Sequence, residues 1–449
     1  MATQVEQLPV LTKQSSFSES SHWHVLLAAW LGLMFDGMDA TIFLLVLFPA
    51  LSELLGTTSH ATVGSYGGVI LAAFMTGWAV GAIGFGILSD YIGRTRAMIL
   101  TILLYAICTG LCAYSHSWVD VAVYRFLVGC GIGGEQSTGI VLIAESWRGK
   151  ARLHATGIMT TAFGCGYLVA GLLNMYLGHL GWRWLFVAGI VPALLTVYIR
   201  SKLKDPLQFQ LVQEYKLRLR DKHQDSGFLL PIKQLFSNGN QTNVLVVSAL
   251  ASTAIVGYWA IMAWIPPWIN QLTGTLAIPE RTTATLIMNV GSIVSGLITG
   301  ALIISCGRRN AFRIAFVGAL LCFLGMFLTV KSFGPSLLAW TFAVGFFAQL
   351  PFQCVFIYAP ELFDATIRGT AVGFSVQTGR LLGALAALIG GQLISLSGGS
   401  YAIAGSCVAM FYFVGIIASF FMPRTDGEVT VSPAILLENE QQRLYTQRV

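Results

Sequence analysis

Long apolar stretches recur along this chain, separated by short clusters of charged residues, glycine and proline. A helix needs about 20 apolar residues to cross the hydrocarbon layer of a membrane. Stretches of roughly that length lie at 25–48, 66–88, 97–114, 118–143, 155–177, 182–199, 243–268, 283–304, 311–331, 336–359, 369–395 and 400–422. The pattern therefore predicts an all-α membrane protein with twelve transmembrane helices.

The composition agrees with this interpretation. Hydrophobic residues make up 55% of the chain and charged residues 10%, whereas soluble domains carry about 25% charged residues. The first 24 residues are polar and rich in serine, without the basic region, short apolar core and cleavage site of a signal peptide. We therefore expect the span that starts at Val25 to be retained.

The positions of lysine and arginine predict the orientation. Arg125 and Arg380 fall deep inside predicted spans, while Arg183, Arg281 and Lys331 lie at the loops of one side. All other lysines and arginines lie in the tails and at the loops of the opposite side. Because cationic loops stay in the cytoplasm, we expect a multi-pass protein of the plasma (inner) membrane with both termini cytoplasmic. This bias accounts for the net charge of +6 without a nucleic-acid partner.

A polar, basic stretch from Arg200 to about Asn243 divides the spans into six and six. Such a stretch is typical of a linker between two similar domains. We expect a cytoplasmic tail at 1–24, an N-terminal six-helix bundle at 25–199, a cytoplasmic linker at 200–242, a C-terminal six-helix bundle at 243–422 and a cytoplasmic tail at 423–449. The basic run at 216–222 is most simply a solvated or membrane-surface helix.

The two halves repeat each other. GFGILSDYIGRTR at 84–96 matches ITGALIISCGRRN at 298–310, and ESWRGKARLHATG at 145–157 matches ELFDATIRGTAVG at 361–373, with nearly equal spacing. Parallel six-span repeats are a known plan of secondary transporters, with the substrate site near the midplane between the halves. The second copy has Ile304 where the repeat predicts an acid, so we expect the loops to act asymmetrically.

The motifs identify a family resemblance. GILSDYIGRTR at 86–96 resembles the loop between the second and third spans of the major facilitator superfamily, although Tyr91 and Thr95 depart from the usual basic residues. RFLVGCGIGGE at 125–135 is similar to the fourth-span motif of that superfamily. The segments DGMD, AESW, PELF and VQTGRLLGA resemble the organic-acid proton symporters, first the sialate and lactate branch and then the aromatic-acid branch. The resemblance implies a cavity lined by the first, fourth, seventh and tenth spans.

Charged residues inside the spans are functional candidates, because a charge near the bilayer centre costs several kcal/mol. At about 1.5 Å per residue, Asp36 and Arg380 both lie roughly 16 Å from the cytoplasmic edge, close to the midplane. Asp39 lies one turn further out, where Arg125 reaches a similar depth. We expect Asp39 and Arg125 to form an ion pair with a structural or coupling role.

Asp36 and Glu135 are the candidates for proton coupling. Burial disfavours an ionised carboxylate, whereas a nearby arginine favours it. Asp39, if paired, should stay ionised, which leaves Asp36 for reversible protonation unless Arg380 neutralises it in the empty carrier. Glu135 has a structural alternative, a carboxyl group bound to an adjacent helix that does not titrate during transport.

Arg380 is the candidate substrate clamp, because a guanidinium offers a planar fork that matches a carboxylate. The alternative is an arginine bound to Asp36 or to carbonyl groups, which only holds the halves together. The other predicted substrate-binding residues are polar or aromatic, and they are Tyr258, Gln349, Gln353 and Gln377.

Charged residues at the cytoplasmic ends of the spans are candidates for a gate. Ion pairs among them would hold the halves together when the carrier faces outward. The alternative is charge that only sets topology. The candidate gate residues are Asp90, Arg94, Glu145, Arg152, Glu361 and Arg368.

Several function classes lack support in the sequence. It has no phosphate-binding loop, no zinc-protease or nucleophile-elbow motif and no cysteine spacing typical of a metal site. We expect no enzyme activity, no metal and no cofactor beyond a proton gradient. The predicted function is proton-coupled symport of a small organic acid, such as a monocarboxylate, sialate or aromatic acid, by a monomer that alternates its access in the lipid bilayer. The alternatives are a facilitator or efflux carrier for a neutral or cationic metabolite, and a sensor that binds a ligand without moving it.

Overall fold

The computed structural model describes residues 19–203, 205, 209–213, 230–237, 239–273, 278–397, 400–425 and 427–429. Across these ranges the chain forms α-helices and short 3-10 helices, and no strand. The basic run at 216–222 and most of both predicted tails lie outside the described residues. The boundaries expected for the tails and the linker therefore stay predictions.

The N-terminal half forms long helices that match the predicted spans. They are α1 (Glu19–Leu55), α2 (His60–Ile92), α3 (Arg94–Cys112), α4 (Trp118–Ser146) and α5 (Gly149–Leu177), followed by the short η1 (Gly178–Leu180). The sixth predicted span, 182–199, is interrupted and consists of α6 (Trp182–Ala188) and α7 (Ala193–Lys202). Pro192 precedes α7, and a proline has no backbone N–H to continue the hydrogen-bond pattern of the preceding helix.

The C-terminal half repeats this arrangement. Its elements are α9 (Leu230–Leu235), α10 (Asn240–Thr273), α11 (Ile278–Thr329), α12 (Pro335–Tyr358), η2 (Ala359–Glu361), α13 (Arg368–Leu396), α14 (Tyr401–Ala409) and α15 (Tyr412–Phe420). α11 joins two predicted spans across a kink at Gly307, where φ is 76°. Glycine adopts positive φ without steric cost, so this residue turns the chain where a separate loop was expected.

The described residues contain ten helical segments that are long and apolar enough to cross a membrane. The two other predicted spans are the interrupted pair α6–α7 and the helix α13, whose side chains from 386 to 396 are not described. These elements agree with the predicted all-α fold of twelve spans.

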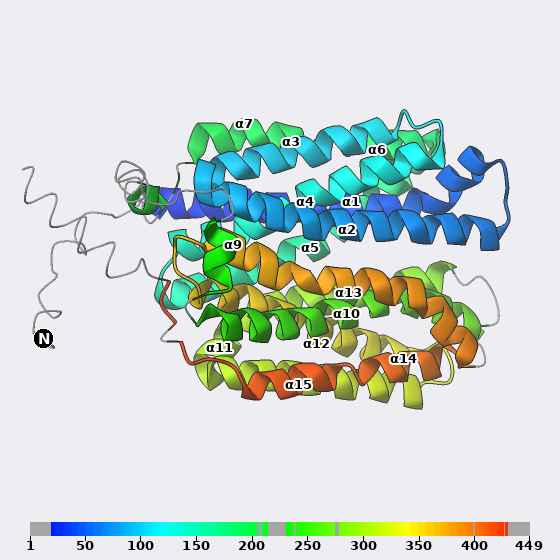
Figure 1. The fold of residues 1–449 in the computed structure, drawn as a ribbon. Helices are drawn as coiled ribbons and strands as arrows, with labels where there is room; N and C mark the ends of the chain where they lie inside the picture. Colours follow the sequence, from blue (N-terminus) through cyan, green and yellow to red (C-terminus); the bar gives the residue numbers. More distant parts are fainter. Residues whose placement is uncertain are drawn as a thin grey trace, which may run out of the picture.

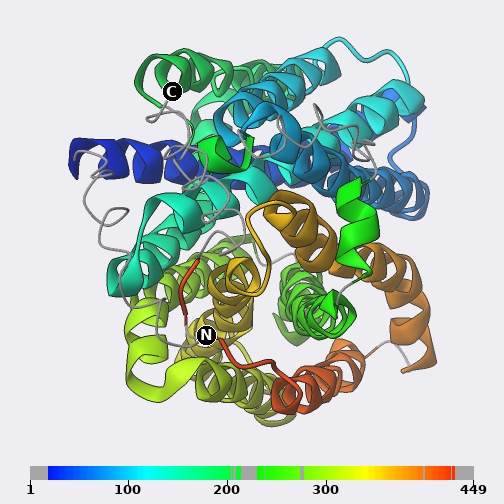
Figure 2. The same ribbon diagram turned by 60° about the vertical axis from the view of Figure 1, so that its left-hand side comes forward.

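The two halves lie side by side, with α1–α7 on one side and α10–α15 on the other (Figure 1). They meet mainly where α2 packs against α13 and α5 packs against α11, a contact visible from a second direction in Figure 2. Glycines allow this approach: a Cβ at Gly373 would overlap the backbone of Ala82. Close backbone contact of this kind is typical of packed membrane helices.

One end of the bundle carries α9, the 3-10 helix η2 and the turn between α2 and α3 (Figure 1). We call this end the linker end, because Asp205 and α9, which belong to the stretch between the halves, lie there. The sequence predicts that it faces the cytoplasm.

Candidate functional site

A narrow cavity lies between the two halves. The residues that line it come from α1, α4 and α5 on one side and from α10, α12 and α13 on the other. Five of them are aromatic, and the others are aliphatic or polar apart from one cation. The lining residues are Leu33, Gln136, Thr160, Phe163, Ile255, Tyr258, Trp259, Gln349, Phe352, Phe356 and Arg380.

Arg380 reaches across this cavity from α13 to the N-terminal half. Its Nε donates to Oε1 of Gln377 at 2.5 Å, and its Nη2 donates to Oε1 of Gln136 at 3.0 Å. The guanidinium carbon lies 3.4 Å from the ring centroid of Trp78, a cation–π contact. Nη1 is buried and donates to no described residue. One arm of the guanidinium therefore remains for a ligand.

Gln136 and Trp78 are functional candidates that the sequence analysis missed. Gln136 is buried on α4 and also accepts a hydrogen bond from Nε2 of Gln377 at 2.6 Å. Trp78 is fully buried on α2. Gln136 directly follows the candidate acid Glu135 in a glycine-rich part of this span, and this adjacency was a signal. Trp78 gave none, because tryptophan in a span is most often a packing residue.

Two buried acids lie close to each other, and one of them, Asp36, interacts with Arg380. Asp36 on α1 and Glu135 on α4 are 0% and 1% exposed. Their carboxyl groups face each other within hydrogen-bond reach, and apart from this contact both oxygens of Asp36 and Oε2 of Glu135 have no hydrogen-bond partner among the described residues. Asp36 also interacts electrostatically with Asp39 and Arg380. Gly32 leaves room for this arrangement, because a Cβ there would overlap Oε1 of Glu135.

Asp39 and Arg125 form a buried ion pair, as their depths predicted. Nη1 of Arg125 lies 2.8 Å from Oδ2 of Asp39. The hydroxyl of Thr109 donates to Oδ1 of Asp39 at 2.5 Å, so three helices meet at this pair. The guanidinium also lies against the rings of Phe43 and Phe186, with centroids at 5.2 and 4.9 Å. Both oxygens of Asp39 thus accept hydrogen bonds from the side chains of Arg125 and Thr109.

The remaining predicted substrate contacts divide into two groups. Tyr258 and Gln349 line the cavity, and Gln377 contacts Arg380 without lining it. Gln353 lies elsewhere: its Oε1 accepts hydrogen bonds from Ser295 and Thr299 at 2.8 and 2.7 Å. Gln353 therefore joins α12 to α11 within the C-terminal half, and we leave it out of the proposed site.

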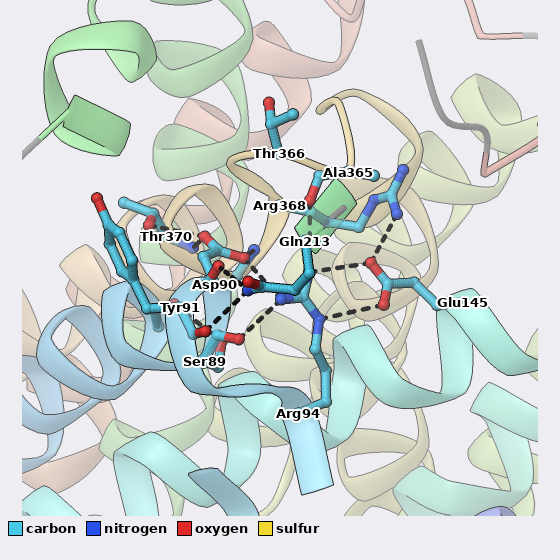
Figure 3. Close-up of polar contacts among 12 residues, drawn as sticks. Ser89, Asp90, Tyr91, Arg94, Glu145, Gln213, Ala365, Thr366, Arg368 and Thr370 are labelled. Atoms are coloured by element: carbon cyan, nitrogen blue, oxygen red, sulfur yellow. Dashed lines mark hydrogen bonds and ion pairs between the residues drawn. The ribbon is translucent and has the colours of Figure 1, made fainter. Parts of the chain in front are cut away.

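At the linker end, Asp90 joins the two halves (Figure 3). Its Oδ1 accepts a hydrogen bond from the backbone N–H of Gly369 at 3.1 Å, and its Oδ2 accepts one from the N–H of Thr370 at 2.8 Å. These groups belong to the first turn of α13, whose unpaired N–H groups favour a negative charge. Asp90 of α2 therefore caps a helix of the other half.

Glu145 forms a second connection beside Asp90 (Figure 3). Its two oxygens accept hydrogen bonds from Nε and Nη2 of Arg94, both at 3.1 Å. The carboxylate also binds Nη1 of Arg368, from the C-terminal half, at 2.8 Å. All three side chains are buried, so one carboxylate of α4 links two arginines from different halves.

Glu361 forms the third connection. It binds Arg152 of α5 through Oε1 and Nε of Arg308 at 2.6 Å through Oε2. Nη2 of Arg152 also donates to the carbonyl of Gly427 at 2.8 Å, in the segment that follows α15. The structure thus brings the six candidate gate residues together in contacts that join the halves at the linker end.

This geometry closes one end of the bundle below a central cavity. The cavity contains an arginine with a donor to spare, and Asp36, whose carboxyl group faces that of Glu135, lies near that arginine. The lining, one cation among aromatic and polar side chains, matches the chemistry of a small anion with an apolar or aromatic body.

Residues 29–386 match the family described as the Major Facilitator Superfamily. The chain is 27% identical to the cis,cis-muconate transport protein of Acinetobacter baylyi, over 91% of this chain and 96% of that protein. It is 29% identical to a probable 4-methylmuconolactone transporter of Cupriavidus pinatubonensis, over 89% and 90% of the two chains. It is 26% identical to the sialic acid transporter NanX of Escherichia coli, over 79% and 83%.

The fold is also similar to solved structures. The proton:xylose symporter XylE, bound to 6-bromo-6-deoxy-D-glucose, superimposes with a TM-score of 0.74 at 18% identity, over 91% of this chain and 97% of that chain. The human organic anion transporter MFSD10 superimposes with a TM-score of 0.73 at 17% identity, over 89% and 99%. At this identity the likeness concerns the fold, and the family match carries the assignment. This chain therefore belongs to the Major Facilitator Superfamily and is a multi-pass membrane transporter, not an enzyme.

Proposed function

We propose that this protein is a proton-coupled symporter of a small organic acid. The observation that carries the proposal is the buried Nη1 of Arg380, which makes no hydrogen bond to any described residue, beside a cavity between the halves. A buried guanidinium arm without an acceptor is costly. A substrate carboxylate would supply that acceptor.

The body of the substrate would lie against rings. Phe163, Tyr258, Trp259 and Phe352 line the cavity around Arg380, and aromatic faces favour flat apolar groups. The names of the relatives, which include cis,cis-muconate, benzoate and gallate transporters and a sialic acid transporter, support a carboxylate as cargo. We favour an acid with an unsaturated or aromatic body over a short aliphatic acid such as lactate.

Coupling follows from the charges at the site. Two ionised carboxylates held close together in an apolar interior repel each other and lose hydration. Adding a substrate anion increases that cost, so the anion and a proton on Asp36 or Glu135 favour each other's binding. The carrier would then reorient readily when loaded with both. The empty site, with unprotonated acids, would reorient poorly.

Uptake into proteoliposomes tests the proposal. Cis,cis-muconate, benzoate, gallate, sialic acid and lactate would each be offered with and without an imposed pH gradient, alkaline inside. We expect accumulation of at least one ring-bearing or unsaturated acid above its external concentration, and loss of that accumulation when a protonophore is added. Equal uptake with and without the gradient would contradict proton coupling, although it would leave acid transport intact.

A second candidate function is carriage of a neutral or cationic metabolite. The observation that favours it is that Arg380 is already engaged by Trp78, Gln136 and Gln377, as a purely structural arginine would be. Under this alternative, replacing Arg380 by glutamine would leave the substrate affinity of a properly folded carrier unchanged. The same uptake assay distinguishes the two functions when neutral sugars or amines are offered to the proteoliposomes in place of acids.

A further inference from the structure

The two repeats balance their charges differently at the linker end. In the N-terminal repeat, Arg94 lies 3.0 Å from Asp90 and 3.1 Å from Glu145. The backbone N–H of Thr95, in the first turn of α3, donates to the carboxylate of Asp205 at 2.8 Å. Acids from three places therefore surround the turn between α2 and α3.

The equivalent turn of the C-terminal repeat, at the kink of α11, is surrounded by cations. The repeat places Ile304 at the position of Asp90 and Arg309 at the position of Thr95. A pocket with about 890 Å³ of unfilled space opens here, between α11 and the segment that follows α15. Four arginines line it: Arg308, Arg309, Arg313 and Arg424.

Hydrogen bonds and ion pairs within the protein engage only some of the donor groups of these four arginines. Arg308 shares Glu361 with Arg152, so one carboxylate serves two arginines. Arg309 donates from Nη2 to the carbonyl of Met422. Nε of Arg309 is buried and has no hydrogen-bond partner among the described residues. The pocket therefore has positive charge and at least one buried donor to spare.

Arg313 has the same excess of donors. Its Nη1 donates weakly to Asn310 at 3.4 Å, and its guanidinium lies 4.4 Å from the ring centroid of Phe420. Its Nε is buried and donates to no described residue. The forked donors of several arginines around one space match the oxygens of a phosphate group.

An apolar surface adjoins the pocket on α11 and α15. On α11, Ile314 and Val317 are 43% and 39% exposed. On α15, Ile417 and Phe420 are 57% and 60% exposed, and Phe421, just beyond its end, is 68% exposed. A free phosphate would use only the arginines, whereas a phospholipid would use the arginines for its headgroup and this surface for its acyl chains.

We infer that the arginine pocket between α11 and the segment after α15 binds the phosphate headgroup of an anionic phospholipid. Basic pockets at the membrane surface attract such lipids. The bound headgroup would supply the negative charge that Asp90 and Asp205 supply in the other repeat. It would also hold the segment that contains Met422 and Arg424 in place. This assignment does not depend on which substrate the carrier moves.

Lipid retention by the full chain tests the inference. The protein would be reconstituted in nanodiscs of equimolar phosphatidylglycerol and phosphatidylethanolamine, extracted into detergent, and examined for bound lipid by native mass spectrometry. We expect bound phosphatidylglycerol in excess over phosphatidylethanolamine. In a double variant, Arg313→Gln with Arg424→Gln, we expect affinity for phosphatidylglycerol to fall by roughly fivefold for each arginine removed.

Arg148→Gln is the matched control, because Arg148 is an exposed arginine at the same end and does not line the pocket. It should retain lipid as the unmodified protein does. Unchanged retention by the double variant, or equal retention of both lipids by the unmodified protein, would overturn the inference. The comparison of the two lipids on the unmodified protein decides the matter even if the double variant folds poorly.

Two further experiments identify the source of the negative charge in the pocket. Stabilisation of the lipid-free protein by inorganic phosphate as strong as that by phosphatidylglycerol would show that a free anion is enough, and would overturn the assignment to lipid. Asp426 lies outside the described residues. If only an Asp426→Asn variant shows the excess of phosphatidylglycerol, the chain neutralises the pocket itself and the inference is wrong.

Discussion

The guanidinium of Arg380 on α13 lies over the ring of Trp78 on α2, with 3.4 Å between the guanidinium carbon and the ring centroid. This contact crosses from one half of the transporter to the other beside the central cavity. In the transport cycle that we propose, the halves rock about this site. Arg380 would then respond both to a ligand in the cavity and to the position of the opposite half.

Replacing Arg380 by glutamine removes the charge and should weaken substrate binding by about 2–5 kcal/mol. Replacing it by lysine keeps the charge but removes the planar fork, so we expect a smaller loss of binding. Titration of tryptophan fluorescence with the transported acid measures this loss, since Trp78 and Trp259 both lie at the site. Arg183→Lys, in an exposed ion pair with Glu53, is the control and should bind normally. Full affinity in the glutamine variant would show that Arg380 does not bind the carboxylate.

Neutral replacements of the two acids should separate coupling from transport. Asp36→Asn and Glu135→Gln mimic the protonated groups, so the acid that carries the coupled proton becomes permanently loaded. We expect that variant to lose accumulation driven by a pH gradient while it still exchanges labelled for unlabelled substrate across the liposome membrane. The other variant should keep both activities, with altered affinity. Gradient-driven accumulation by both variants would exclude these acids from coupling.

The sequence predicted the contact between Asp39 and Arg125 because depth along a straight helix follows from residue number alone. Both residues lie on uninterrupted helices, so the depth counted from residue number holds for each of them. The candidate gate residues were grouped for a similar reason, since they lie at helix ends that the repeat marks twice, and their role as a gate stays a prediction. The pairing within the gate, with Glu145 between Arg94 and Arg368, needed the structure.

Contacts that depend on how a helix is rotated could not be predicted. α12 is apolar on nearly all sides, so its pattern does not tell which face meets α11 and which meets the cavity. The family resemblance placed Gln353 at the cavity because it implies that the tenth span lines it, but it does not tell that this side chain faces Ser295 and Thr299. The contact of Gln136 with Arg380 depends on the relative tilt of the two halves, about which a single sequence carries no information.

Asp39→Asn should destabilise the fold rather than alter coupling. The variant leaves Arg125 buried without a counter-charge, and breaking a buried ion pair in this way costs about 3–5 kcal/mol. Thermal unfolding in detergent would show a large drop in the melting temperature. Glu53→Gln removes one partner of an ion pair whose side chains are 54% and 40% exposed, and it should cost at most about 1 kcal/mol. Similar melting temperatures for the two variants would contradict the structural role of Asp39.

Gly373→Val should push the halves apart at the linker end. The valine side chain would overlap backbone atoms of Ala82 at the contact between α13 and α2. Overpacking of this kind typically costs about 1–3 kcal/mol. Because the cost applies only while that end is closed, we expect the population open at the linker end to rise and the transport rate to fall. Gly171→Val is the control, since a Cβ at Gly171 meets nothing within 4 Å. Equal transport by the two variants would show that this contact does not limit the cycle.

Glu145→Gln should open the linker end more strongly than any single change at its arginines. The carboxylate binds Arg94 and Arg368 together, so the variant leaves two buried guanidinium groups facing each other with a neutral amide between them. Their repulsion is relieved when the halves separate, and water can then reach both.

A cysteine introduced at Ser89, which is fully buried beside Asp90, measures the opening. Its reaction with a polar thiol reagent should be slow in the protein that carries Ser89→Cys alone, and faster after Glu145→Gln is added. The native cysteines contribute a background that the protein without the probe corrects. Arg148→Gln in the same background changes one charge at the same end without touching the gate, and it should leave the reaction rate unchanged. If Glu145→Gln also leaves the rate unchanged, Glu145 holds the loops of its own half and does not act as a gate.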